Sequence, residues 1–475
     1  MPPTLAEAKC QQRGRDFAEL FRYQYVFARA RGLSFPGWGA RHVGGWTLHH
    51  GAALGVTDIE DVAGRKVGLL AGVALSADSR LVAGRLRLPL GAEDTGFVAA
   101  AEGILTSLAG RYVAFLVVPG AARAYADPVG DMGLVYDPET GALGSTPGVV
   151  LRRGLRANPA FELRRVLRGD VQFSLGHTAD AVVRRLIPNH YLDLGDFTLH
   201  RHWPPRDMGF DIPEAAVPET VDAITARLGA HFRALVSNLP CVVPLTGGRD
   251  SRILISCGMA DLDQVAEFSA FRFHNASRVD SRMGRDLAAS MGLFFRQYFK
   301  VAASWTQKRD FRLKSGYSGQ RGEFRAIAMV ESFPRDHVVL RGNILELLRA
   351  NQWRADRVNR PFKLLHGLRR IFVVPRPLER AAIDVWGPAY MAWREGLPEN
   401  ARPRTYDFGF VELLLPNTQG AFFAGYHGCF PLNPFNDRKL IGLAIGLPVE
   451  MRRRNAIVET VFRRTNPWLL DVPFH

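Results

Sequence analysis

The fold is decided by the stretch Cys241-Val-Val-Pro-Leu-Thr-Gly-Gly-Arg-Asp-Ser-Arg-Ile-Leu-Ile255. Its first five residues predict a buried strand, the glycines predict a turn, and the residues from Ser251 predict a helix. A strand, a glycine turn and a helix in this order form the first unit of a parallel α/β sheet. The turn therefore lies where the N–H groups and the dipole of the helix favour an anion.

The turn also carries side chains suited to a bound phosphate chain. Its glycines let the main chain approach phosphate oxygens and adopt a positive φ, its two hydroxyls are donors, and its arginines supply charge if they face inward. Asp250 is a candidate Mg²⁺ ligand, because Mg²⁺ takes one or two carboxylates together with phosphate oxygens. The spacing of a Walker A motif is absent, and a Gly-Gly turn is also a common structural cap. The candidate nucleotide-binding residues are Thr246, Gly247, Gly248, Arg249, Asp250, Ser251 and Arg252.

This turn resembles the SGGxDS loop of the PP-loop ATP pyrophosphatases, with Thr246 in place of the first serine. Within that class the chain is most similar to asparagine synthetase and its relatives, which include β-lactam synthetase and the lasso-peptide cyclases. The order and spacing of several fragments along the chain carry this resemblance. They are Gly110–Phe115, Ala124–Gly130, Ile187–Tyr191, Asp280 with Gly284–Gly292, Leu340–Glu346 and Asn433–Asp437.

The resemblance implies two domains of different architecture. Residues 1–202 would form a glutaminase-like domain, an antiparallel β-sandwich with flanking helices of the N-terminal-nucleophile (Ntn) type. Residues 203–475 would form an ATP-binding synthetase domain, a PP-loop parallel α/β sheet with many helices. The fold class is thus α/β combined with α+β. The many short strands and tight turns before residue 202 independently favour packed antiparallel sheets.

The resemblance also implies an activity and its participants. ATP would react with a substrate carboxylate to give an acyl-adenylate and pyrophosphate, and an amine would then form an amide. Mg²⁺ would be held by Asp250 and Glu346, and Asp280 would lie on a helix beside the nucleotide. Glu346, Glu412 and Arg453 are the candidate catalytic residues. The implied partners are small-molecule or peptide carboxylates and amines.

The sequence departs from this family at three places. A glutaminase of this type needs a cysteine directly after the initiator methionine, because the free α-amino group helps to activate the thiol. Here Pro2 and Pro3 follow Met1, and the nearest thiol is Cys10, so we expect no glutamine hydrolysis. The metal-binding aspartate of the family falls on Leu345, and its C-terminal lysine falls on Asn455.

Composition limits the remaining classes of function. The net charge of +15 favours an anionic partner, but only seven of the 61 basic residues are lysine, which also fits a compositional bias towards arginine. No apolar run is long enough to span a membrane, and no signal-peptide layout opens the chain, so we expect a cytoplasmic protein. The four cysteines are far apart and predict neither disulfides nor a cysteine-rich metal site.

Two alternatives to the ligase stay open at this stage. The changes at Leu345 and Asn455 favour a degenerate family member that binds a nucleotide or a pathway partner without turnover. Sulfur transfer to tRNA, which other PP-loop proteins perform, fits the basic charge but needs reactive cysteines. A membrane partner is not expected, a nucleic-acid partner is disfavoured, and a homo-oligomer is left open.

Overall fold

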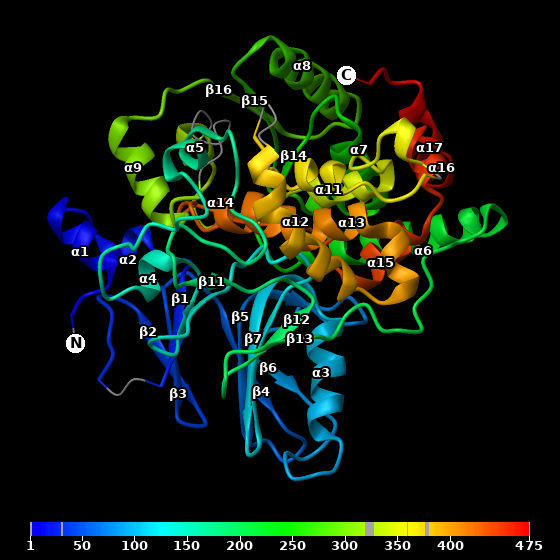
Figure 1. The fold of residues 1–475 in the computed structure, drawn as a ribbon. Helices are drawn as coiled ribbons and strands as arrows, with labels where there is room; N and C mark the ends of the chain where they lie inside the picture. Colours follow the sequence, from blue (N-terminus) through cyan, green and yellow to red (C-terminus); the bar gives the residue numbers. More distant parts are fainter. Residues whose placement is uncertain (1, 30–31, 319–326, 359, 376–379, 475) are drawn as a thin grey trace.

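A computed structural model describes residues 2–29, 32–318, 327–358, 360–375 and 380–474. Two of its three sheets lie in the N-terminal part of the chain (Figure 1). The six-stranded sheet has the order β11 (Arg184–Arg185), β9 (Val135–Asp137), β10 (Ala142–Gly144), β1 (Tyr25–Ala28), β3 (Trp46–His50), β2 (Gly39–Val43). The seven-stranded sheet has the order β13 (Leu199–Arg201), β12 (His190–Asp193), β8 (Ala121–Ala126), β7 (Ala109–Val118), β5 (Lys66–Leu75), β4 (Val56–Glu60), β6 (Arg85–Arg87).

The two sheets pack face to face through large aromatic side chains. The ring of Phe27 on β1 stacks on Trp46 at 4.9 Å and on Phe115 of β7 at 4.0 Å between centroids. The outer face of the seven-stranded sheet is covered by α3 (Phe97–Ser107), and that of the six-stranded sheet by α1 (Leu5–Gln12), α2 (Phe17–Leu20) and α4 (Pro147–Val150). The result is a four-layer arrangement of helix, sheet, sheet and helix, in which all strand pairs are antiparallel except β4 with β6 (Figure 1).

The third sheet is entirely parallel, with the order β16 (Phe295–Phe299), β15 (Glu267–Arg272), β14 (Cys241–Pro244), β17 (Val338–Leu340), β18 (Phe430–Leu432). Alternate residues of β14 face different layers, as the period of a strand requires. Val243 joins the cluster of α6 (Val217–Val236), α7 (Arg249–Cys257) and α17 (Ala456–Thr465), whereas Val242 joins Phe311 of α9 (Trp305–Lys314). Both faces of the sheet are therefore covered, which is typical of parallel sheets.

The remaining chain is mainly helical. It comprises α5 (Leu163–Arg168), α8 (Asn275–Ser290), η3 (Asn343–Arg349), α11 (Leu364–Arg370), α12 (Arg380–Glu395), α13 (Thr405–Gly409), the π-helical η6 (Phe410–Leu414) and η7 (Pro416–Gly420), α14 (Ala421–Phe423), α15 (Arg438–Gly446) and α16 (Val449–Arg453). Short 3₁₀ turns lie at Glu214–Ala216, Met259–Gln264, Ala355–Arg357, Glu399–Arg404 and Pro467–Leu470. The expectation of a mixed α/β protein with a parallel sheet is confirmed.

A buried carboxylate joins the antiparallel sheets to the helical part. Glu412 accepts two hydrogen bonds from the guanidinium of Arg201, at 2.7 and 3.0 Å. It also accepts one from Trp393 Nε1 at 2.8 Å and one from Asn189 Nδ2 at 3.2 Å. A buried carboxylate is stable only when it is paired and hydrogen-bonded in this way. Glu412 therefore fastens β13 to η6.

A second buried cation crosses the same boundary. Arg438 on α15 donates to the side-chain oxygen of Asn189 at 2.9 Å and to the carbonyl oxygens of Thr106 and Ala126 at 2.9 and 3.0 Å. The predicted division at residues 202 and 203 stays a prediction, but the two halves it separates share buried polar contacts. No helix within the described ranges combines the length and apolarity needed to cross a membrane.

We predict that Glu412→Gln lowers the free energy of unfolding by about 3 kcal/mol, because Arg201 would keep its charge in a site with little access to water. Urea denaturation measures this change. Glu459→Gln on α17 is the matched control, since Glu459 pairs with Arg463 on the surface and its loss should cost less than about 0.5 kcal/mol. Equal losses in the two variants would contradict the structural role of Glu412.

Candidate functional site

The glycine turn lies at the centre of the parallel sheet. It follows β14, the first strand of the sheet, and opens α7. From β14 the chain proceeds to β15 on one side and later returns to β17 on the other. Ligands of open parallel sheets bind outside the carboxyl ends of the strands at such a switch point. The strand, turn and helix predicted from the sequence are confirmed here, and α7 begins at Arg249.

The two hydroxyl side chains of the turn brace its backbone. Thr246 N–H donates to Ser251 Oγ at 3.2 Å, and Gly248 N–H donates to Thr246 Oγ1 at 3.2 Å. Gly248 has a φ of −74°, so it does not use the positive φ that glycine permits. No side chain caps the first turn of α7, whose N–H groups lack partners within the helix. Those groups are the natural donors to an anion.

A cavity of about 250 Å³ opens beside the turn, between the ends of three strands. The buried hydroxyl of Ser269 on β15 lines it and has no hydrogen-bond partner among the described residues. On the other side, a Cβ on Gly342 would lie 3.2 Å from Cβ of Asp250, so a larger residue there would require Asp250 to shift slightly. The lining residues are Pro244, Thr246, Asp250, Ser251, Leu254, Ser269, Ala270, Phe271, Leu340, Arg341, Gly342 and Asn343.

The structure brings the two predicted metal ligands close to each other. Oδ2 of Asp250 accepts a hydrogen bond from Arg349 Nη2 at 2.7 Å, and Oδ1 is buried without a partner among the described residues. Burial raises the pKa of Asp250 to about 6; the charge of Arg349 opposes this rise, and that of Glu346 adds to it. Burial also raises the pKa of Glu346. The Asp250 and Glu346 carboxylates thus form a pair, with Arg349 as their nearby cation.

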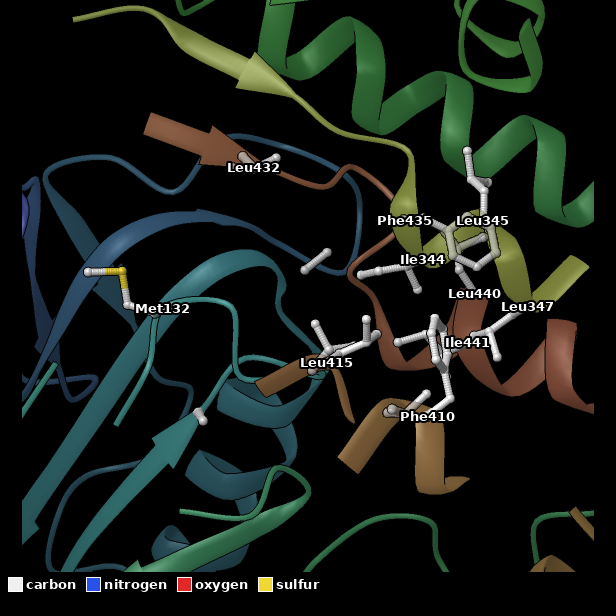
Figure 2. Packing of buried hydrophobic residues seen from close by; sticks show 14 of the residues in the cluster. Met132, Ile344, Leu345, Leu347, Phe410, Leu415, Leu432, Phe435, Leu440 and Ile441 are labelled. Atoms are coloured by element: carbon white, nitrogen blue, oxygen red, sulfur yellow. The ribbon is translucent and has the colours of Figure 1, made fainter. Parts of the chain in front are cut away.

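The predicted metal site consists of this pair alone. Within the described ranges, no group of three or more histidine, cysteine, aspartate or glutamate side chains is placed to hold a metal ion. Two carboxylates nevertheless suit Mg²⁺ when phosphate oxygens complete its coordination. Leu345, at the position of the family's aspartate, is 1% exposed and packs in the apolar cluster of η3, Phe410, Phe435 and Ile441 (Figure 2).

The two arginines of the turn contact the C-terminal segment. Arg252 is fully buried and donates to the carbonyl oxygens of Val472 and Pro473 at 2.8 and 2.6 Å. The guanidinium groups of Arg249 and Arg252 lie 4.7 and 4.5 Å from the ring centroid of Phe474. Neither arginine lines the cavity of the turn. The structure thus uses Arg252 to hold the C-terminal segment against α7.

Three other predicted site residues lie away from this cavity. Asp280 is half-buried on α8; burial and the charge of Arg249 lower the pKa of Arg252, and the charge of Asp280 partly opposes this. Arg453 pairs with Glu450 at 3.5 Å on α16, and Glu412 is enclosed by its partners in the boundary between the two halves. The helix α8 itself is near the turn, since a Cβ on Gly284 would collide with the carbonyl oxygen of Leu245.

Part of the basic stretch Met451–Asn455 also has a structural role. Arg452 is fully buried and forms a two-point pair with Asp407, at 3.0 and 2.9 Å. Asn455, which falls on the family's lysine, has a φ of +61° and caps the start of α17. Asparagine tolerates this left-handed conformation better than lysine does. Its identity at this position is therefore explained by backbone geometry.

A larger cavity of about 570 Å³ adjoins the first, and Asn343 lines both. Glu346 also lines this second cavity, together with many basic residues between 354 and 370. No sequence motif indicates this cavity, because its lining comes from several separate segments, among them η3, α11, η6 and η7. The signal that could have indicated it is the density of basic residues in the stretch from Arg354 to Arg370.

Comparison of the sequence with models of known protein families and with curated proteins finds no match in either set. The family resemblance therefore remains an interpretation of the motifs.

The cysteines are unsuited to thiol chemistry. Cys10 on α1 is 2% exposed, and burial raises its pKa to about 11. Burial also raises the pKa of Cys241, Cys257 and Cys429, each to about 12. The thiolate is the reactive form of cysteine, and these environments disfavour it at neutral pH.

We predict that Arg349→Gln destabilises the protein more at pH 8 than at pH 5. The folded-state pKa of Asp250 is about 6, above its value in the unfolded chain, and removal of Arg349 raises it further. At pH 8 the variant must either leave Asp250 charged without its cation or protonate it at a cost, whereas at pH 5 a neutral Asp250 needs no cation. The loss should grow to about 1–2 kcal/mol as the pH rises through 6, because the pair is partly exposed.

Urea denaturation at the two pH values measures this difference. Arg463→Gln, which removes a surface partner of Glu459, is the matched control and should show no such pH dependence. A loss for Arg349→Gln that is the same at pH 5 and pH 8 would contradict the coupling of Arg349 to Asp250.

Proposed function

We propose that this protein is an ATP-dependent amide ligase of the asparagine-synthetase type, which forms AMP and pyrophosphate and does not hydrolyse glutamine. One observation carries the proposal. The hydroxyl-Gly-Gly-Arg-Asp-Ser turn opens into a cavity at the switch point of a parallel sheet, and a second cavity adjoins it. The first cavity suits the phosphate chain of a nucleotide, and the second suits the acyl and amine substrates.

The proposed reaction has two steps. A carboxylate oxygen of the substrate attacks the α-phosphorus of ATP, and the bond between the α-phosphorus and the bridging oxygen breaks, so that pyrophosphate leaves. The nitrogen of an amine then attacks the acyl carbon, AMP leaves, and the amine nitrogen loses a proton. The products are an amide, AMP, pyrophosphate and a proton.

The residues of the turn would act on the leaving pyrophosphate. The free N–H groups at the start of α7 and the helix dipole stabilise its developing charge, and they are already oriented before the reaction. Ser251 and Thr246 keep the turn in this shape through their mutual hydrogen bonds. When bound, Mg²⁺ would neutralise phosphate charge beside Asp250 and Glu346.

The residues present fit such an ion. Oδ1 of Asp250 is a buried acceptor without a partner in the described ranges, and Glu346 is close enough to raise the pKa of Asp250. Both carboxylates require a cation if they are to be charged together. Arg349 contacts one oxygen only, so the second remains available to a metal ion.

Glu346 also suits a role in the second step. It lines the larger cavity, where the amine would bind, and burial raises its pKa. A Mg²⁺ ion beside Glu346 would oppose that rise. Within the proposal, Glu346 therefore accepts the proton that the amine nitrogen loses after the ion has left with the pyrophosphate. Glu412 and Arg453 have no role in this proposal, because neither lines a cavity of the site.

The four-layer N-terminal half is consistent with a glutaminase-type scaffold that lacks its nucleophile. Cys10 is buried on α1, outside the first strand, with its thiol protonated at neutral pH. Within the proposal, the amine is supplied by a substrate or by free ammonia. The buried thiols also disfavour sulfur transfer to tRNA.

The second candidate function is nucleotide binding without turnover. Leu345 favours it, because an apolar residue packs in the core where relatives are expected to hold the metal. The pairing of Asp250 with Arg349 favours it too, since an arginine partly replaces the charge of an ion. Pyrophosphate release distinguishes the two functions.

We predict that calorimetric titration with α,β-methylene ATP detects binding that requires Mg²⁺ and is weakened at least tenfold by Asp250→Ala. The physical reason is the loss of a metal ligand beside the phosphate chain. Asp286→Ala on α8 is the control, because Asp286 is exposed and pairs only with its neighbour Arg285. It should bind the analogue as the unmodified protein does.

Each result has a clear consequence. Metal-dependent binding that Asp250→Ala abolishes supports the nucleotide site, and a screen of carboxylate and amine pairs for pyrophosphate release then separates ligase from binder. No binding of millimolar analogue to the folded protein would overturn both candidate functions.

A further inference from the structure

The second cavity has a strongly asymmetric charge. Its lining includes five arginine and lysine side chains but only two acidic ones. Its volume of about 570 Å³ lies within the usual range for small-molecule sites. The basic members are Arg354, Arg357, Lys363, Arg369 and Arg370, and the acidic members are Glu346 and Asp356.

The basic side chains are incompletely neutralised. Arg354 and Arg357 share one carboxylate, that of Asp356, at 3.0 and 3.1 Å. Lys363 and Arg369 have no acidic partner among the residues that the structure describes. Glu346 is close enough to Asp250 for its charge to raise the pKa of Asp250, and Asn343 lines both cavities. The lining of the second cavity thus has an excess of positive charge.

A buried histidine in the cavity wall responds to this charge. His366 bonds through Nε2 to the carbonyl oxygen of Gln352 at 3.0 Å. Its pKa is lowered mainly by burial, and the positive charges of Arg370, Arg354 and Arg357 lower it further. The guanidinium groups of these three arginines therefore all lie close enough to His366 to affect its pKa.

The lining from the π-helical segments is apolar apart from Thr418 and Gln419. Phe410, Leu414 and Leu415 come from the π-helical segment and its continuation. Gln419 is 7% exposed, lines the cavity, and has an Oε1 without a hydrogen-bond partner among the described residues. A buried acceptor of this kind is satisfied by a donor on a bound molecule or by water.

We propose that this cavity takes a polyanionic acyl substrate, a carboxylic acid that carries at least one further anionic group, either a carboxylate or a phosphate. The inference rests on the proposed function. The reacting carboxylate would lie at the end formed by Asn343, where the cavity meets the nucleotide site. The second anion would lie against Lys363 and Arg369, and a hydroxyl or amine of the substrate would donate to Gln419.

The geometry disfavours a simple monocarboxylic acid. Such a substrate would bring no partner to Lys363 and Arg369, and it would gain little from a wall of cations. An arginine fork binds carboxylate or phosphate in a two-point geometry, whereas lysine acts as a point charge. Both anions are therefore compatible with this wall, and the experiment must distinguish them.

The test is calorimetric titration of the full chain, without nucleotide and at low ionic strength, with three probes. Tricarballylate carries only carboxylates, 3-phosphoglycerate carries one carboxylate and one phosphate, and butyrate is the monoanionic reference. We expect at least one of the two polyanions to bind at least tenfold more tightly than butyrate. The tighter of the two identifies the second anionic group as carboxylate or phosphate.

Variants locate the binding. Lys363→Gln and Arg369→Gln should each weaken polyanion binding three- to tenfold, and both residues are exposed, so the variants should fold. Arg87→Gln, an exposed arginine of β6 in the other half, is the charge-matched control and should bind as the unmodified protein does. Ser251→Ala, in the turn, should also leave the polyanion affinity unchanged.

The proposal would be overturned if butyrate bound as tightly as both polyanions, or if neither Lys363→Gln nor Arg369→Gln weakened polyanion binding. Loss of polyanion binding in Ser251→Ala would also overturn it, because that result would place the anion at the turn. The titration with α,β-methylene ATP and Mg²⁺ tests the nucleotide site separately. Polyanion binding without nucleotide binding would refute both candidate functions and leave the cavity as a polyanion site without an acyl role. Nucleotide binding without polyanion binding would refute this inference alone.

Discussion

The site depends on one constraint, the direction in which the chain leaves the central strand of the parallel sheet. After β14 the connection runs to β15, and the chain returns on the opposite side to form β17. The ends of β14 and β17 are neighbours, but the segments that follow them diverge, which leaves space between Thr246 and Gly342. The donors of α7 and the carboxylates of Asp250 and Glu346 gather there as a consequence of this strand order.

A second level of organisation is the buried polar boundary between the antiparallel sheets and the helices. Glu412 and Arg438 both contact Asn189 and are almost completely enclosed by protein. An acidic residue at the position of Glu412 suggested chemistry in the sequence, but Glu412 accepts hydrogen bonds from Arg201 and Asn189 of the first half and from Trp393 of its own half. Burial without access to a cavity distinguishes this structural role from a catalytic one.

Sequence reasoning succeeded where the signal was local. The strand, turn and helix around Thr246 follow from adjacent residues. It failed where partners are distant in sequence: Arg252 is satisfied by Val472 and Pro473, more than 200 residues later. The second cavity is missed for the same reason, since no single segment contains enough of its lining to form a recognisable motif.

The structure gives a more specific explanation for the many arginines in this chain. Many arginines have carboxylate partners, as Arg201, Arg349 and Arg452 do, and these pairs explain part of the composition without any ligand. The cavity lined by Lys363 and Arg369 differs from these ion pairs, because its five basic side chains are accompanied by two acidic ones in the lining. A compositional bias explains the number of arginines but not their convergence on one cavity beside the glycine turn. Electrostatic complementarity to the proposed polyanionic substrate would account for that convergence.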